Sequence, residues 1–130
     1  MSDRVSIFVV EDDLLIQLSL QTTLEDGGFA VAVASTGEQA IDMLNDVSAQ
    51  YRAIVTDIDL GNSQIHGWAV ARRAREIQND LPVIYMTGKS AKEWGAHGVP
   101  NSILLQKPFA TAQLVTALAQ LLNVGNTPGS

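Results

Sequence analysis

Five short apolar runs, alternating with segments suited to helices, constrain the fold of this chain more than any other feature. The runs lie at Val5–Val10, Phe29–Val33, Ala53–Val55, Leu81–Met86 and Ile103–Leu105. Near-continuous apolar runs of this length are typical of strands buried on both faces, and parallel strands need helical crossovers between them. The alternation therefore predicts an α/β fold, a doubly wound five-stranded parallel sheet with helices on both faces.

The segments between the runs carry apolar residues at helical spacing. The first has Ile16, Leu20 and Leu24, and the last has Leu114, Leu118 and Leu121. Gly27-Gly28 gives the first helix an end signal, and Ser35 and Glu38 have the spacing of a capping box before the second helix. We expect one domain over residues 1–124 and a flexible C-terminal tail over residues 125–130.

Composition excludes several classes of function. Fourteen acidic against eight basic residues leave a net charge of -6, which disfavours direct binding to nucleic acid. The chain has no cysteine, so disulfides, thiolate metal sites and cysteine nucleophiles are excluded. No run approaches the roughly 18 apolar residues that span a bilayer, so we expect no membrane partner and a cytoplasmic location.

Polar residues follow four of the five apolar runs. Glu11 and Asp12 come after the first run, Asp57 after the third, Thr87 after the fourth and Lys107 after the fifth. Because the carboxyl ends of parallel strands share one edge of a sheet, we expect these five side chains to converge. An acidic pair after a strand is, by itself, more often a solvated helix start, but four strands ending in suitable groups favour a single site.

The convergence of three carboxylates has a chemical consequence. Their mutual repulsion raises a pKa or recruits a cation, and Mg²⁺ prefers oxygen ligands of this kind, with Asp12 and Asp57 as proposed ligands. The Lys107 ammonium and the Thr87 hydroxyl suit the oxygens of a phosphoryl group captured by a carboxylate. The sequence thus predicts a magnesium-dependent phosphoryl site.

Four segments, VVEDD, IVTDIDL, VIYMTG and LLQKPF, make the chain similar to the response-regulator receiver family over residues 5 to about 123. The resemblance implies a flavodoxin-like (βα)5 fold with Asp57 as the phosphoacceptor. It also implies Mg²⁺ binding by Glu11, Asp12, Asp57 and the backbone carbonyl of Asp59, with Thr87 and Lys107 contacting the phosphoryl group. In this family the peptide before the proline, here Lys107–Pro108, is commonly cis.

The family's mechanism implies the partners. A receiver takes its phosphoryl group from a phosphohistidine on a sensor histidine kinase or a phosphotransfer protein. It catalyses only its own phosphorylation and dephosphorylation, so we expect a signalling domain and not an enzyme acting on other substrates. We expect a stand-alone response regulator that signals to an unknown downstream protein by protein–protein contact.

The chain departs from the family in two places. Leu104 stands where the family usually has a switching Tyr or Phe. The segment before the fifth run contains Gly95, Gly98 and Pro100, which predict a short or irregular fourth helix. The family's usual aromatic switch is therefore missing, and the sequence leaves the mode of switching open.

Asp59 and Lys89 lie two residues beyond Asp57 and Thr87, where the family admits the attacking water. One hypothesis is that their charges tune the lifetime of the phosphoryl group. The alternative is an exposed ion pair without a kinetic role, which contributes about 0–1 kcal/mol. The sequence leaves both open.

Two other classes of function compete with a phosphorylated receiver. A degenerate receiver would act as a phosphate-independent binding module. The presence of the acidic pair together with Asp57, Thr87 and Lys107 argues against it. A haloacid-dehalogenase-type phosphatase is suggested by DIDLG and YMTG, but that family begins with its aspartate pair and has further acidic ligands after its lysine. The basic residues Arg72, Arg73 and Arg75 are interpreted as a solvated helix face.

Overall fold

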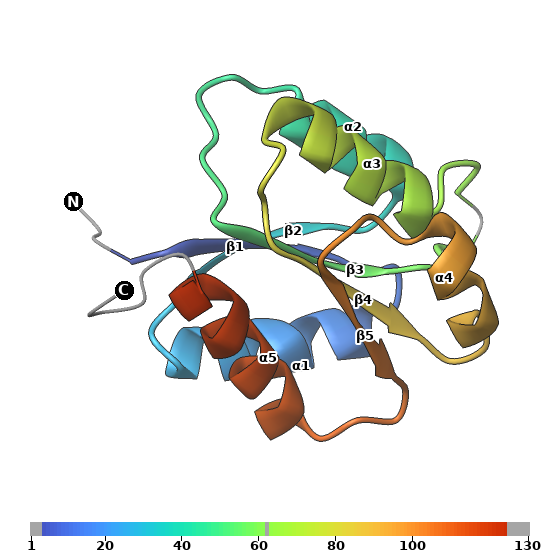
Figure 1. The fold of residues 1–130 in the computed structure, drawn as a ribbon. Helices are drawn as coiled ribbons and strands as arrows, with labels where there is room; N and C mark the ends of the chain where they lie inside the picture. Colours follow the sequence, from blue (N-terminus) through green and yellow to red (C-terminus); the bar gives the residue numbers. More distant parts are fainter. Residues whose placement is uncertain (1–3, 62, 125–130) are drawn as a thin grey trace.

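The structure is a five-stranded parallel sheet in the order β2-β1-β3-β4-β5, with helices on both faces, which confirms the predicted architecture (Figure 1). The computed structural model describes residues 4–61 and 63–124. The elements are β1 (Ser6–Val10), α1 (Leu14–Asp26), β2 (Ala30–Ala34), α2 (Gly37–Leu44), β3 (Ala53–Asp57), α3 (Gly67–Ile77), β4 (Val83–Thr87), the 3-10 turn η1 (Ala91–Glu93), α4 (Trp94–His97), β5 (Ser102–Gln106) and α5 (Thr111–Val124). The predicted tail, residues 125–130, lies outside the described residues.

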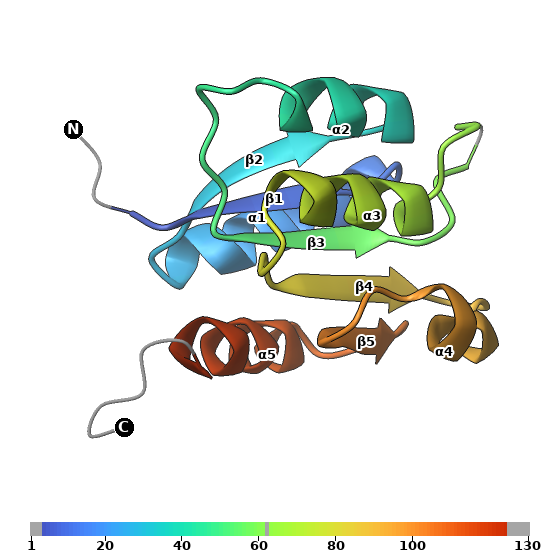
Figure 2. The ribbon, with the colours of Figure 1, turned by 45° about the horizontal axis from the view of Figure 1, so that its top comes forward.

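Two hydrophobic cores lie on opposite faces of the sheet. Helices α2 and α3 cover one face, and α1 and α5 cover the other (Figure 2). Strand residues alternate between the cores, so that Phe8 packs under α2 and α3 while its neighbour Ile7 packs against α1 and α5. Strands β3 and β4 are buried along their whole length, which explains why their sequences are apolar without alternation.

Local signals set the helix boundaries. Asp13 caps α1, because its Oδ1 accepts hydrogen bonds from the backbone N–H groups of Leu15 and Ile16 at 2.9 and 3.2 Å. Gly28, at φ +96°, follows the end of α1 as the glycine pair predicted. The predicted Ser35 cap of α2 was one residue off, since Thr36 is the N-cap and its hydroxyl accepts from the Gln39 N–H.

The fourth helix is short, as predicted. It consists of one 3-10 turn and the four residues of α4, because Gly95 weakens the helix and Gly98 ends it. Among the described residues, no helix has the length and apolar character required to cross a bilayer.

The strand boundaries differ from the predicted ones by one or two residues. Asp57 and Thr87 are the last residues of β3 and β4, not the residues after them, because their backbones still pair within the sheet. The order of the strands reverses between β1 and β3, so their carboxyl ends flank a topological switch point. The predicted site residues lie at this edge.

Candidate functional site

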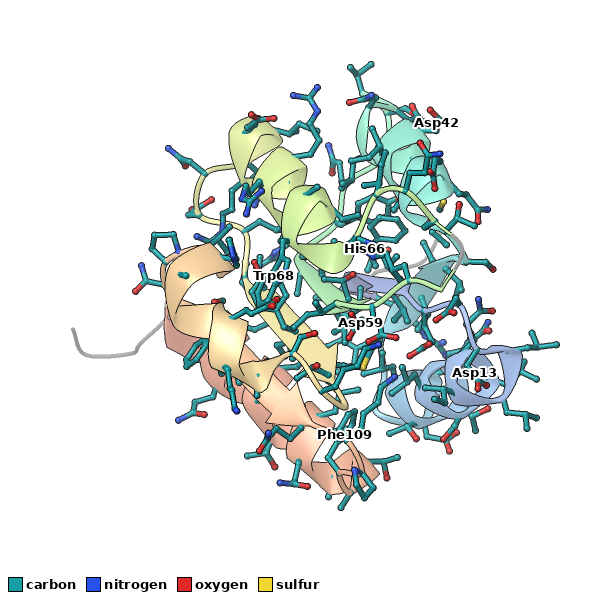
Figure 3. All side chains as sticks on the ribbon, turned by 90° about the vertical axis from the view of Figure 1, so that its right-hand side faces the viewer. Asp13, Asp42, Asp59, His66, Trp68 and Phe109 are labelled. Carbon is teal, nitrogen blue, oxygen red and sulfur yellow. The ribbon has the colours of Figure 1, made fainter. Side chains whose placement is uncertain are left out.

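Three carboxylates meet at the carboxyl-terminal edge of the sheet. Glu11, Asp12 and Asp57 each place a carboxylate oxygen within 4.8 Å of the others. Figure 3 looks onto this edge and shows Asp59 near the centre, with Asp13, the residue before α1, to its right and Phe109, beyond β5, below it. The convergence expected from the strand ends is therefore present.

Lys107 joins two of these carboxylates. Its Nζ donates to Glu11 Oε1 at 3.0 Å and to Asp57 Oδ2 at 3.3 Å. The Glu11 side chain is 1% exposed and that of Asp57 is 7% exposed, so both pairs are shielded from water. The peptide between Lys107 and Pro108 is cis, as the family resemblance implied.

Burial raises the pKa values of two carboxyls at the site. Desolvation, with repulsion from Asp57, raises the pKa of Glu11 to about 7 although Lys107 acts against this rise. Desolvation also raises the pKa of Asp57, and Asp12 adds to the rise. Burial disfavours the charge on Lys107, but hydrogen bonding to Glu11 and attraction to Asp57 outweigh it and raise the pKa of the amine.

Thr87 ends β4 beside these groups with a fully buried side chain. Its Oγ1 accepts hydrogen bonds from the backbone N–H groups of Lys89 and Ser90, at 3.1 and 2.7 Å. The hydroxyl therefore uses its acceptor capacity on the β4–η1 loop and keeps its hydrogen for donation. A donor at this position suits an oxygen anion arriving at the carboxylates.

Asp59 pairs with Ser90 and not with Lys89. The Ser90 hydroxyl lies 3.3 and 3.0 Å from the two carboxylate oxygens of Asp59, joining the β3–α3 loop to the β4–η1 loop. Among the described residues, no ion pair joins Asp59 to Lys89, so the alternative of an Asp59–Lys89 ion pair was wrong. The hypothesis that their charges tune phosphoryl lifetime stays a prediction.

Sequence reasoning missed three residues that support the site. Gln17 is a polar residue of α1, but it is buried and donates to the Glu11 carbonyl at 2.6 Å. Its signal was its spacing of three residues from Leu20, which puts it on the buried face. Gly61, at φ +56°, leaves room beside Asp12, and Gly67 lies against the Asp57 carbonyl.

The donor set fits a hard divalent cation. It consists of carboxylate oxygens alone, and Asp12 is exposed while the other two are buried, so the cluster opens to solvent on one side. Burial is the main cause of the raised pKa values of Glu11 and Asp57, and a cation bound among these groups would favour their ionised forms.

Curated relatives include the response regulator MprA of Mycolicibacterium vanbaalenii, 30% identical over 120 residues, which cover 91% of this chain and 50% of the relative. MprA of Mycobacterium tuberculosis is 31% identical over the same share. This chain thus spans about half the length of the curated relatives it matches.

Solved structures show the same fold. A response regulator receiver protein from Sinorhizobium medicae is 45% identical with a TM-score of 0.89, and the match covers 93% of this chain and 96% of that one. The receiver domain of the sensor histidine kinase PA1611 from Pseudomonas aeruginosa, crystallised with a magnesium ion in its active site cleft, is 23% identical with a TM-score of 0.78, covering 92% and 98%.

The family comparison also distinguishes between the interpretations made from sequence. The sequence model of the response regulator receiver domain matches residues 7–119. This match, with the relatives and the fold, favours the receiver over the haloacid-dehalogenase phosphatase. The chain belongs to the response regulator receiver family.

Proposed function

We propose that this receiver accepts a phosphoryl group on Asp57 from a phosphohistidine of a sensor kinase or a phosphotransfer protein, and then signals by protein–protein contact. The observation that carries the proposal is the position of Lys107 Nζ, 3.0 Å from Glu11 and 3.3 Å from Asp57 within the carboxylate cluster. This arrangement brings together a nucleophile and a fixed positive charge at one solvent-accessible edge.

In the proposed reaction a carboxylate oxygen of Asp57 attacks phosphorus, forming an O–P bond as the P–N bond to imidazole breaks. The imidazole leaves with the electron pair of that bond and takes up a proton. Lys107 neutralises charge on the transferred phosphoryl oxygens, and the Thr87 hydroxyl donates to one of them. Thr87 ends β4, which pairs with β3, the strand that ends at Asp57. Lys107 follows β5, which pairs with β4.

Glu11, Asp12, Asp57 and the backbone carbonyl of Asp59 would hold magnesium. When bound, the ion would supply positive charge to the carboxylates and phosphoryl oxygens. The carboxylate cluster supports this assignment, as does the magnesium reported in the cleft of the Pseudomonas receiver.

A groove beside the site is suited to docking of the donor protein. A groove of about 460 Å³ lies between α1 and the β5–α5 connection, and Lys107 is part of its wall. Leu14 and Leu15 beside it are 64% and 78% exposed, which is unusual for large apolar side chains that have no partner. We infer that this groove receives the phosphorylated partner.

Intact mass after incubation with magnesium and acetyl phosphate tests the chemistry. We expect one phosphate adduct on the wild type, none on Asp57→Asn, and a normal adduct on Asp42→Asn, which makes the same change at an exposed carboxylate of α2. Absence of an adduct on the folded wild type, both here and with a phosphohistidine donor, would favour the degenerate binding module. An adduct that persists on Asp57→Asn would contradict the assignment of Asp57.

The docking surface is tested separately from the chemistry. Leu15→Asp should slow transfer from a phosphorylated histidine protein while leaving phosphorylation by acetyl phosphate unchanged. Val47→Asp adds the same charge at a side chain that is 99% exposed on the α2–β3 loop, and it should alter neither rate. Equal transfer rates for all three proteins would exclude the groove as the docking surface.

A further inference from the structure

The β3–α3 loop, residues 58–66, carries the one proposed magnesium ligand that is a backbone group. A carbonyl such as that of Asp59 cannot be re-aimed by rotation of a side chain, so its position depends on the conformation of the loop. The loop also passes against a second ligand, because a Cβ on Gly61, which has φ +56°, would lie 2.5 Å from Asp12 Oδ2. Whatever fixes this loop therefore affects two of the proposed ligands.

Backbone hydrogen bonds hold the loop on both sides of Asp59. On one side, the Ile58 N–H donates to the Met86 carbonyl of β4 at 3.0 Å. On the other side, the Leu60 carbonyl accepts from the Ser63 N–H at 2.9 Å, which closes a turn. Asp59 thus lies between a residue that the sheet fixes and a residue whose position depends on Ser63.

Glu38, in the first turn of α2, holds the far side of this loop with both oxygens of its carboxylate. Its Oε1 accepts from the Ser63 hydroxyl at 2.6 Å, and its Oε2 accepts from the Gln64 N–H at 3.1 Å. The Ser63 hydroxyl in turn accepts from the Gly37 N–H at 2.8 Å, so it bridges the backbone and a side chain of the helix start. The hydrogen bond from Ser63 lowers the pKa of Glu38, which keeps the carboxylate ionised at neutral pH and its hydrogen bonds charge-assisted.

Helix α2 is a firm support for the loop. Its start is capped by Thr36, and Ala40 and Leu44 are buried in the core under α2 and α3. Its first residue, Gly37, lies so close to the loop that an added Cβ would overlap the carbonyl of Ile65. A loop that is hydrogen-bonded to such an element has less conformational freedom than one held by its two ends alone.

We propose that Glu38 is a positioning residue for magnesium: its carboxylate fixes the β3–α3 loop, through Ser63 and Gln64, in the conformation that presents the Asp59 carbonyl beside the carboxylate cluster. The inference rests on the magnesium site proposed above. Glu38 is not a member of that cluster, so it acts on the ion only through the loop. An acidic residue at the start of a helix commonly interacts with the helix dipole alone, whereas here both carboxylate oxygens are bonded to the loop.

Amide NMR titration with magnesium chloride, at pH 8 and constant ionic strength, tests the proposal without any phosphodonor. Removing a group that directly supports a metal ligand typically raises the Kd of the metal about 10- to 100-fold. Glu38 acts one step further away, so Glu38→Ala should raise the magnesium Kd about fivefold. Ser63→Ala should have a similar effect, and the double variant should be little worse than either, because both changes break the same hydrogen bond.

Two controls separate this role from an effect on helix stability or net charge. Thr36→Ala weakens the same end of α2 by removing its N-cap. Asp42→Ala removes the same charge from an exposed position of the same helix. Both variants should keep the wild-type magnesium Kd, whereas Glu38→Gln, which retains one acceptor oxygen, should recover part of the affinity that Glu38→Ala loses.

The rate of phosphorylation by acetyl phosphate gives a second readout. Glu38→Ala should react slowly at limiting magnesium and at the wild-type rate when magnesium is saturating. A wild-type Kd in Glu38→Ala, or an equal rise in Thr36→Ala, would overturn the role of Glu38 and leave the proposed function untouched. A wild-type chain that binds no magnesium would overturn the magnesium site itself, and the role of Glu38 with it.

Discussion

The surroundings of Glu11 disfavour the negative charge of its carboxylate. It is 1% exposed, its backbone carbonyl is held by Gln17, and its carboxylate faces Asp57. A raised pKa for an acid means that the folded state keeps a proton which the unfolded state has already lost. Ionisation of Glu11 therefore lowers the free energy of unfolding, and a bound cation would reduce this loss.

The pH dependence of stability follows from this shift. The pKa of Glu11 is about 7 in the folded state, against 4.5 for a free glutamate. Ionisation of Glu11 therefore lowers the free energy of unfolding as the pH rises between these two values, and it causes no further change above them. The total loss is about 3 kcal/mol. Urea unfolding in the presence of a chelator should show this fall, and Glu11→Gln should remove most of it.

Glu93→Gln provides the control, because Glu93 is exposed in η1 and the substitution makes the same chemical change. Its stability should follow the wild-type pH profile. Asp57 has a shift of the same direction, so a shallow fall should persist in Glu11→Gln. A profile for Glu11→Gln as steep as that of the wild type would show that Glu11 is not the group responsible.

At the scale of elements, the first residue of α3 fixes the end of β3. Gly67 lies so close to the strand that a Cβ there would overlap the Asp57 carbonyl and Ile58 Cα, both of which are backbone atoms. Backbone cannot rotate away as a side chain can, so Gly67→Ala must move α3 or the Asp57 turn. We expect a loss of about 1–3 kcal/mol in unfolding free energy together with slower phosphorylation of Asp57.

Gly95→Ala is the matched control for this prediction. Gly95 lies within α4, and an added Cβ there meets no atom within 4 Å. Alanine should raise stability slightly, by about 0.5–1 kcal/mol, because it favours helical backbone. Thermal unfolding of both variants checks the contrast, and equal stability of Gly67→Ala and the wild type would contradict the close packing described here.

The sequence predicts elements better than it predicts their contacts. The five strands and the short α4 were predictable because buried parallel strands have apolar runs and glycines weaken helices. The convergence of Glu11, Asp57 and Lys107 followed from the topology alone. The Ser90 bond to Asp59 did not, because it joins two loops whose relative position depends on packing across the sheet.

Leu104 is a second residue whose contacts could not be predicted from the sequence. The sequence shows that the family's aromatic residue is absent, but not what takes its place. In the structure Leu104 pairs with Tyr85 across β4 and β5, and both belong to the core under α2 and α3. The Tyr85 ring packs against Trp68 at 4.8 Å between ring centroids, and its hydroxyl accepts from the Val99 N–H. This face already contains two large rings, so a smaller side chain at position 104 fits.

For the whole molecule, the site should link cation binding to global stability. A ligand that binds only the folded state stabilises it by RT ln(1 + [L]/Kd), about 2.7 kcal/mol at one hundred times Kd. For a domain of this size that is a rise of roughly 10 °C in the melting temperature. We expect magnesium chloride to produce this rise at pH 8, beyond the effect of sodium chloride at equal ionic strength.

The same experiment at pH 6 separates site binding from general screening. With a pKa of about 7, Glu11 is mostly protonated at pH 6, so a cation must displace its proton and the rise should be smaller. Glu11→Gln with Asp12→Asn should abolish the magnesium-specific rise, whereas Asp42→Asn with Glu93→Gln changes the net charge equally and should retain it. An equal rise in both double variants would mean that magnesium acts on the acidic surface as a whole, because only the first pair alters the cluster at the strand ends.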